Sequence, residues 1–273
     1  MSAHRIEQRT ADGSSTLSHP AHGQTYHSLD GAWTQARERY ARGARLAERA
    51  HELARLGRAR LRLLDVGTGL GLNLAAALEA LEGTGVVLVA TSLERDAALL
   101  EQVAREPREP ESLERRHAHV RAAIRAALQA PGAVNVPLAG GTLALRVGDA
   151  RETLLALPEY ERFDAVFLDP FSPRVEPELW SRDFLAAVAG RMAPGSALAT
   201  YSAAVEVRAA LAAAGLRVGL GARVGRKREG TLASPDLDLP ALPPRSARRV
   251  ARRASAGTGG FAAGDAEGAA GIL

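Results

Sequence analysis

The hydrophobic residues of this chain follow two alternating periodicities. Short, nearly continuous apolar runs are followed by longer segments in which apolar residues recur every three or four positions. Runs of the first kind are typical of buried strands, and segments of the second kind are typical of amphipathic helices. The expected strands are 61–66, 86–92, 143–147, 163–169 and 196–201, with 216–222 and 230–234 as a final antiparallel pair.

The helices predicted between these strands give the fold class. The longest comes first, over 30–56, where Trp33, Ala36, Tyr40 and Ala44 share one face. Strands that alternate with helices predict an α/β fold with a doubly wound, mostly parallel sheet of the Rossmann-like kind. The other expected helices are 72–81, 96–106, 112–129, 178–192 (ended by Pro194-Gly195) and 205–214.

The same pattern divides the chain into three parts. Residues 1–56 form an N-terminal extension with its helix, and residues 57–234 form the α/β domain. From Pro235 the periodicity disappears, and proline, glycine and alanine dominate. Such a composition cannot build a core, so we expect 235–273 to be a disordered tail. The basic part of this tail either contacts RNA weakly or is simply solvated.

Composition limits the classes of function. The 273 residues contain no cysteine, which excludes disulfides, thiolate metal sites and cysteine nucleophiles, and no metal site is expected. No apolar run approaches the roughly 18 residues that span a membrane, and the N-terminus lacks a signal-peptide core, so we expect a cytoplasmic protein. The net charge of +4 is compatible with a phosphate-bearing partner. Lys227 is the single lysine among 35 basic residues, which a GC-rich genome also explains.

A glycine-rich turn follows the first long strand. Gly67, Gly69 and Gly71 alternate with other residues, and Asp65 lies two positions before them. The dinucleotide-binding pattern needs two residues between its second and third glycines, so it fails here, and the absence of a phosphate-loop lysine disfavours ATP. An acid followed by Gly-x-Gly is typical of a loop that binds S-adenosylmethionine at a helix N-terminus, and Asn73 belongs to the same candidate site. An ordinary strand–helix turn is the alternative.

Two further acids follow neighbouring strands. Glu94 comes after the second strand, where a carboxylate can accept both ribose hydroxyls of a nucleoside. Asp149 follows the third, where a carboxylate can accept the adenine amino group. The alternative for Glu94 is a charge at the start of a helix, and for Asp149 a helix N-cap. Together with the glycine loop, the two acids predict that S-adenosylmethionine is bound.

The fourth strand ends in a carboxylate at a stiff turn. Asp169 is followed by Pro170, Phe171 and Pro173, and both prolines forbid the strand to continue. In an open α/β sheet, ligands bind beyond the carboxyl ends of the strands. The carboxylate next to an aromatic ring suits an enzyme that holds and deprotonates an amine beside a flat base. The alternative is a turn carboxylate that bonds local amides.

Several motifs resemble one family in order. Leu168-Asp-Pro-Phe-Ser-Pro173 with Glu176-Pro-Glu-Leu-Trp180 is similar to the signature of MnmC-like methyltransferases. Ala199-Thr-Tyr-Ser-Ala203 and Gly225-Arg-Lys-Arg-Glu229 resemble later motifs of that family. Asp12-Gly-Ser14, Tyr26-His-Ser28 and Gly31-Ala32 look like the segment that closes over its cofactor. The resemblance covers about 12–234. Gln24 and Glu176 depart from the pattern, which leaves the nucleoside specificity open.

The resemblance implies a class I fold with a seven-stranded sheet. It also implies methyl transfer from S-adenosylmethionine to the amine of 5-aminomethyl-(2-thio)uridine at the wobble position of tRNA. Asp169 then orients or deprotonates the amine, with help from the Pro170 carbonyl, and Phe171 stacks on the uracil. Tyr26 lines the cofactor site, as His27 does unless it is structural, and Trp180 packs in the core.

The resemblance also implies partners. Arg226, Lys227 and Arg228 contact phosphates near the tRNA anticodon loop, unless they form a solvated turn. The oxidase half of two-domain relatives has no counterpart in the pattern, so a separate enzyme is expected to supply the aminomethyl group. Two other functions fit the same fold. One is a small-molecule amine transferase like the polyamine synthases, and the other is a non-catalytic RNA-binding module.

Overall fold

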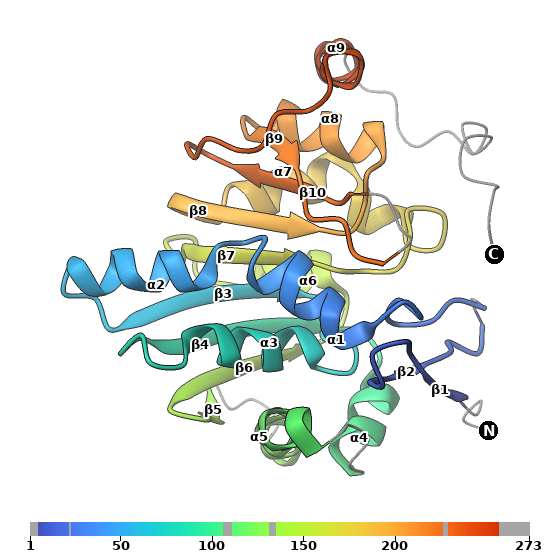
Figure 1. Ribbon diagram of the computed structural model, residues 1–273, viewed down its shortest axis with the longest axis vertical. Helices are drawn as coiled ribbons and strands as arrows, with labels where there is room; N and C mark the ends of the chain where they lie inside the picture. Colours follow the sequence, from blue (N-terminus) through green and yellow to red (C-terminus); the bar gives the residue numbers. More distant parts are fainter. Residues whose placement is uncertain (1–4, 22, 106–110, 131–134, 226–228, 257–273) are drawn as a thin grey trace.

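A mixed β-sheet forms the centre of the molecule. The computed structural model describes residues 5–21, 23–105, 111–130, 135–225 and 229–256. Within these residues the central sheet has eight strands instead of the expected seven. In spatial order they are β5 (Val136–Leu138), β6 (Gly141–Val147), β4 (Val87–Glu94), β3 (Arg60–Val66), β7 (Phe163–Leu168), β8 (Met192–Thr200), β10 (Thr231–Ser234) and β9 (Arg217–Leu220) (Figure 1).

Strands β6, β4, β3, β7 and β8 run parallel, whereas β10 runs antiparallel to both β8 and β9. The predicted doubly wound sheet is therefore confirmed. The additional strand β5 is an edge strand of three residues, antiparallel to β6, and it contains Pro137. Its shortness and its proline concealed it, because proline is tolerated only at the edge of a sheet.

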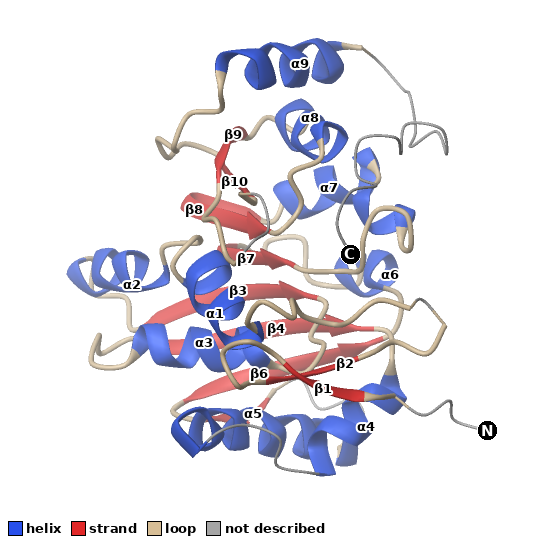
Figure 2. Cartoon of the chain, turned by 45° about the vertical axis from the view of Figure 1, so that its right-hand side comes forward, coloured by secondary structure: helices blue, strands red, loops and turns tan. Residues whose placement is uncertain are grey.

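Helices cover both faces of this sheet (Figures 1 and 2). Side chains alternate between the faces, so Leu63 and Phe167 join one core while Leu64 and Val166 join the other. The first core is covered by α1 (Ala32–Thr34), η1 (Gln35–Ala41), α2 (Leu46–Arg55), α3 (Leu72–Leu81), α4 (Ala97–Arg105) and α5 (Glu111–Gln129). The second is covered by α6 (Ala150–Leu155), η2 (Pro177–Trp180), α7 (Arg182–Ala189) and α8 (Val205–Ala213).

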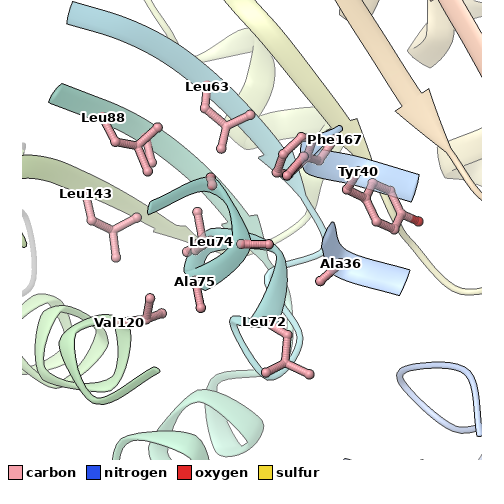
Figure 3. Close-up of a cluster of buried hydrophobic side chains, with 14 of the residues drawn as sticks. Ala36, Tyr40, Leu63, Leu72, Leu74, Ala75, Leu88, Val120, Leu143 and Phe167 are labelled. Atoms are coloured by element: carbon pink, nitrogen blue, oxygen red, sulfur yellow. The ribbon is translucent and has the colours of Figure 1, made fainter. Parts of the chain in front are cut away.

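The core on the first face of the sheet extends up to the carboxyl ends of the parallel strands. Leu63, Leu88 and Leu143 from three strands point toward the side chains of α3 (Figure 3). At the end of this core, the rings of Tyr40 and Phe167 pack edge to face with their centroids 5.6 Å apart. Tyr40 is fully buried, so burial of apolar surface fixes the position from which its hydroxyl emerges.

The expected helix over 30–56 is interrupted. Its middle part, η1, is π-helical, with the Arg42 amide bonded to the Arg37 carbonyl at 2.8 Å. The chain then turns, with Arg45 in the left-handed region at φ 56°, before α2 begins. Upstream, β1 (Glu7–Arg9) and β2 (Ser15–Leu17) form a separate antiparallel hairpin. The N-terminal extension is thus folded against the domain.

The helix predicted over 178–192 is also divided. The short helix η2 ends at Trp180, and α7 begins anew at Arg182, where the Ser181 hydroxyl caps it by accepting the Phe184 amide at 3.3 Å. Strand β8 already begins at Met192 and continues past Pro194-Gly195. An irregularity in its pairing with β7 near Phe163 accommodates this dipeptide.

The expectation of disorder over 235–273 is wrong for residues 235–256. Residues Pro244–Ser255 form helix α9, which packs on α8 and buries Val250 (Figure 2). Apolar residues recur at helical spacing between the arginines of this segment, and that period supplies the contact surface. The remaining residues of the predicted tail, 257–273, lie outside the described part of the chain.

A membrane-spanning helix would need a long apolar stretch, and none of the helices in the described residues has one.

Candidate functional site

Strand register brings the predicted site residues to one edge of the sheet. Val66 on β3 is paired with Leu93 on β4 and with Leu168 on β7. The residues that follow these strands therefore meet, and a cavity of about 820 Å³ lies there. Eight predicted site residues line it: Tyr26, Gly67, Gly69, Glu94, Asp149, Asp169, Pro170 and Phe171.

The glycines of the first turn have different roles. Gly67 and Gly69 line the cavity with φ of 89° and 53°. A side chain at Gly67 would come within 2.7 Å of the Asp169 carbonyl oxygen, so only glycine lets the two turns touch. Gly71 does not line the cavity. A Cβ there would lie 2.7 Å from the Val120 side chain, so Gly71 permits close packing of α3 on α5.

Glu94 is buried at the floor of the cavity. Its Oε2 accepts the Gly69 amide at 3.0 Å and its Oε1 accepts the Asp96 amide at 2.9 Å. Burial raises the pKa of the Glu94 carboxyl. The start of α4 is instead capped by Asp96, which accepts the Leu99 amide at 3.0 Å. Glu94 keeps acceptor capacity on both oxygens toward the cavity, as a ribose diol requires.

Asp149 is the helix N-cap that one prediction gave, and it also lies in the wall of the cavity. At the start of α6 it accepts the Arg151 amide at 2.9 Å. The Arg151 guanidinium, 2.6 Å away, lowers the pKa of the Asp149 carboxyl. The carboxylate is thus held ionised at the wall of the cavity.

Asp65 lies behind the cavity wall. It is fully buried, and its Oδ2 accepts the Ser92 hydroxyl at 2.7 Å. Its Oδ1 has no hydrogen-bond partner among the described residues. Burial raises the pKa of Asp65 to about 8, and the charges of Asp169 and Glu94 act in the same direction. Asp65 is therefore a protonated acid at neutral pH in the absence of a ligand.

Asp169 is held by side chains from two distant segments. The Tyr40 hydroxyl donates to its Oδ1, and the Asn73 amide donates to its Oδ2 at 2.9 Å. Asn73 was predicted to contact the cofactor, and in the structure its amide group holds the carboxylate of Asp169. Beside it, the Tyr201 hydroxyl donates to the Pro170 carbonyl at 3.1 Å. Burial raises the pKa of both tyrosines well above the usual value, so both phenols remain proton donors.

The turn after Asp169 is fixed by its own neighbours. The Phe171 amide donates to Glu176 Oε2 at 2.8 Å, and the Trp180 indole donates to the Phe171 carbonyl at 2.7 Å. Trp180 is fully buried, which confirms its predicted place in the core. The Phe171 ring lies 5.0 Å from that of Tyr26, centroid to centroid, and lines the cavity.

The N-terminal extension forms part of the cavity wall, and three of its side chains attach it to the domain. The Tyr26 hydroxyl donates to Asp96 at 3.2 Å, and the Arg5 guanidinium pairs with the same carboxylate. Gln24 donates to the Ser172 hydroxyl at 3.0 Å, which ties this segment to the turn after Asp169. His27 is buried at the cavity wall, and burial lowers its pKa to about 4, so the ring is neutral.

Sequence reasoning missed the contribution of the π-helical segment η1. Gln35 and Arg39 from this segment line the cavity, and the Arg39 guanidinium donates to the Tyr201 carbonyl at 3.2 Å. Tyr40 was assigned only to the apolar face of a helix. A usable signal existed, because a tyrosine at a core position needs a partner for its hydroxyl.

The predicted basic run Arg226, Lys227 and Arg228 lies outside the described residues. Among the described residues, no cluster of histidines and carboxylates is suited to hold a metal ion.

The cavity suits S-adenosylmethionine. Its size is in the range of sites that enclose a small molecule. Two buried side-chain oxygens without partners among the described residues, Asp65 Oδ1 and Asn73 Oδ1, lie next to the glycine loop, behind the residues that line the cavity. Glu94 would accept the ribose hydroxyls, Asp149 the adenine amine, and the Gly67–Gly69 backbone would contact the methionine part. The surrounding carboxylates favour a cationic sulfonium.

Comparison with known proteins agrees with this geometry. Residues 113–236 match the family described as S-adenosyl-L-methionine-dependent methyltransferase. The chain is 33% identical over 226 residues to the tRNA 5-methylaminomethyl-2-thiouridine biosynthesis bifunctional protein MnmC of Methylibium petroleiphilum, covering 78% of this chain and 32% of that protein. The MnmC protein of an Azoarcus species is 35% identical over 226 residues, with 77% and 32% covered.

A solved structure covers more of the molecule. The crystal structure of MnmC2 from Aquifex aeolicus superimposes with a TM-score of 0.76 at 32% sequence identity, covering 91% of this chain and 76% of that one. The sheet order, the glycine loop at the end of β3 and the acids after β4 and β6 agree with that assignment. The chain belongs to the MnmC-like family of S-adenosylmethionine-dependent methyltransferases.

Proposed function

We propose that this protein methylates the exocyclic amine of 5-aminomethyl-(2-thio)uridine at the wobble position of tRNA. The chain spans about a third of the length of the bifunctional relatives named above, whose names specify 5-methylaminomethyl-2-thiouridine. The observation that carries the proposal is the position of Asp169. Its carboxylate is held by Tyr40 and Asn73 in the same cavity as the glycine loop.

Asp169 would prepare the amine for attack. An aliphatic amine is mostly protonated at neutral pH, and only the neutral form has a lone pair. Asp169 accepts a hydrogen bond from the nitrogen and takes up or passes on its proton. The Pro170 carbonyl, fixed by Tyr201, is a second acceptor next to it. The chemistry that bound S-adenosylmethionine would supply is a methyl group on a sulfonium, open to attack by the nitrogen lone pair, with the C–S electron pair leaving on sulfur.

Alignment of the three reacting atoms would supply most of the acceleration. Both oxygens of Asp169 already accept a side-chain donor, so the carboxylate cannot rotate freely. Phe171 would stack on the uracil, because its ring lines the cavity and its backbone is fixed on both sides by Glu176 and Trp180. The N-terminal segment that Gln24 attaches to Ser172 would exclude water from the transfer.

A methyl-transfer assay tests the proposal. The protein is incubated with S-adenosylmethionine labelled in its methyl group and with tRNA that carries aminomethyl-uridine without the terminal methyl group. The tRNA is then digested and its nucleosides are separated. We expect label in methylaminomethyl-uridine. Identical tRNA that lacks the aminomethyl group is the control, and it should remain unlabelled.

A parallel reaction with polyamines tests a competing small-molecule function, methyl transfer to a polyamine nitrogen. The cavity wall contains Glu94, Asp96, Asp149 and Glu176, an acidity that would also suit a cationic amine. Labelled polyamine together with unlabelled tRNA would replace the present proposal by the small-molecule function. A protein that labels neither substrate but binds tRNA would be the non-catalytic RNA-binding module.

A further inference from the structure

Helix α9 has one strongly basic face. Its arginines stand at positions i, i+3, i+4, i+7 and i+8, a spacing that places them on one side of an α-helix. All of them are exposed, and the helix contains no acidic residue. The members of this arginine face are Arg245, Arg248, Arg249, Arg252 and Arg253.

The opposite side of α9 is already occupied. Ala247, Val250 and Ala254 recur at helical spacing and are buried or half-buried where α9 packs on α8. An amphipathic helix that binds a membrane surface needs a free apolar face to insert between lipids. In α9 that face is covered by the protein, so only the charges remain available for a partner.

The C-terminal end of α9 is fixed at the edge of the sheet where the cavity opens. The Arg182 guanidinium, at the start of α7, donates to the Arg253 carbonyl at 2.6 Å. The Arg253 side chain lies 3.6 Å from the carboxylate of Glu206, in the first turn of α8. Helix α8 begins shortly after the end of β8, which Tyr201 follows, and α7 comes after the Asp169 turn and η2. Helix α9 itself lies beyond α8, on the outside of the molecule (Figure 2).

Among the described residues, few acidic side chains lie near this face. In the described part of the chain, Arg253 of α9 forms an ion pair with Glu206. Within that part of the chain, Arg248 and Arg252 have no carboxylate within ion-pair distance. A row of guanidinium groups on a rigid helix matches a row of phosphates, because each can bond two phosphate oxygens at once.

We propose that the arginine face of α9 binds the sugar–phosphate backbone of the substrate tRNA, outside the catalytic cavity. This inference rests on the proposed tRNA substrate. The face increases affinity for tRNA without reading its sequence, since phosphate contacts position a nucleic acid but do not specify it. It orients the anticodon loop toward the cavity, because its fixed end lies at the same edge of the sheet as Asp169.

The test compares two double variants with equal loss of charge. Arg248→Gln with Arg252→Gln removes the centre of the face, and glutamine preserves helix propensity. The control is Arg55→Gln with Arg60→Gln, two exposed arginines at the opposite, amino edge of the sheet. Binding of full-length tRNA is measured at several salt concentrations, methyl transfer to tRNA is measured at saturating cofactor, and circular dichroism verifies folding.

We expect the α9 variant to bind tRNA about tenfold more weakly near physiological salt, with a slope of log Kd against log salt that is smaller by about 2. Its KM for tRNA rises accordingly, and kcat and the affinity for S-adenosylmethionine are retained. The control variant behaves like the wild type. A wild type that methylates tRNA while both variants bind it equally would overturn the role of α9 and leave the proposed function intact.

Two other outcomes also decide against the inference. A wild type that neither binds nor methylates tRNA would remove the proposed function together with this one. Binding to vesicles of phosphatidylserine and phosphatidylcholine is measured as well, to test whether the arginine face binds a membrane instead. If the α9 variant loses affinity for these vesicles and keeps its affinity for tRNA, the face binds membrane lipids and the inference is wrong.

Discussion

The two ends of the cavity are built in different ways. At the cofactor end, the ligand groups lie within short strand–turn segments, and main-chain amides hold them, as those of Gly69 and Asp96 hold Glu94. At the end proposed to hold the amine, called the amine end below, Asp169 depends on the side chains of Tyr40 and Asn73, which are 129 and 96 residues away in the chain. The first end is therefore a local structure, and the second exists only when the whole domain has folded.

Under the proposed function, this difference separates cofactor binding from methyl transfer. Backbone-held groups at the cofactor end should determine the affinity for S-adenosylmethionine. Side-chain-held groups at the amine end should determine the rate of transfer. Substitutions at the two ends should therefore affect different kinetic constants.

The largest effect is expected for Asp169→Asn. The amide keeps the shape of the carboxylate but cannot take up a proton, so kcat should fall by a factor of about 10² to 10⁴. The affinity for S-adenosylmethionine, measured by calorimetry, should change by less than about threefold. Asp238→Asn is the matched control, because its side chain is fully exposed. If cofactor affinity collapsed as well, Asp169 would belong to the cofactor end and the division would fail.

At the other end, Glu94→Gln should weaken the affinity for S-adenosylmethionine by a factor of about 10 to 100, the usual worth of a hydrogen bond to a charged group. At saturating cofactor the kcat should be retained within a few-fold. Glu101→Gln on α4 serves as control, since it is exposed and bonds only Arg105 among the described residues. A lower kcat at saturating cofactor would show that Glu94 also affects the chemical step.

Tyr40→Phe examines how the amine end is supported. The ring keeps its packing on Phe167, and Asp169 loses one donor, so kcat should fall about tenfold with unchanged cofactor affinity. Tyr160→Phe, 81% exposed, is the control. In a chain that already carries Asp169→Asn, Tyr40→Phe should have almost no further effect on kcat. Additive losses would mean that Tyr40 acts independently of Asp169.

Asp65 lies between the two ends and responds to the charges of both. In the folded protein Asp65 keeps its proton up to a pH of about 8, whereas in the unfolded chain it releases the proton near the ordinary aspartate pKa of 3.8. Stability of the cofactor-free protein should therefore fall as pH rises through this window. Asp65→Asn should remove roughly 1 kcal/mol of this dependence per pH unit, measured by urea unfolding at pH 5 to 8. Equal slopes in both proteins would contradict the assignment.

The sequence was sufficient for the features that depend on neighbouring residues. The parallel strands from β3 to β8 coincide with apolar runs, and the helix over 72–81 was placed correctly. The glycine loop, Glu94, Asp149 and Asp169, which contribute to the cavity wall, could be singled out because each lies at or shortly after the end of such a run. Strand register then requires them to meet, even though no single motif contains them all.

The features that the sequence did not predict depend on contacts between segments that are far apart in the chain. The sequence around Tyr40 indicates a helix, and only packing on Phe167 directs the hydroxyl toward Asp169. Helix α9 was overlooked because its composition suggested disorder, although its alanines and Val250 have a helical period that α8 can cover. Glu176 departs from the family pattern, and in the structure its carboxylate accepts a hydrogen bond from the Phe171 amide.

Gly67 has a consequence for how this enzyme can change. Its bare α-carbon packs against the main chain of Asp169, with space for no side-chain atom between them. The separation of the methyl donor from the proposed amine acceptor is thus a property of two backbones and their strand pairing. The N-terminal segment and the turn after Asp169 can change to accept another nucleophile while the distance between donor and acceptor stays constant. Under this geometry, substrate range and transfer distance are free to evolve separately.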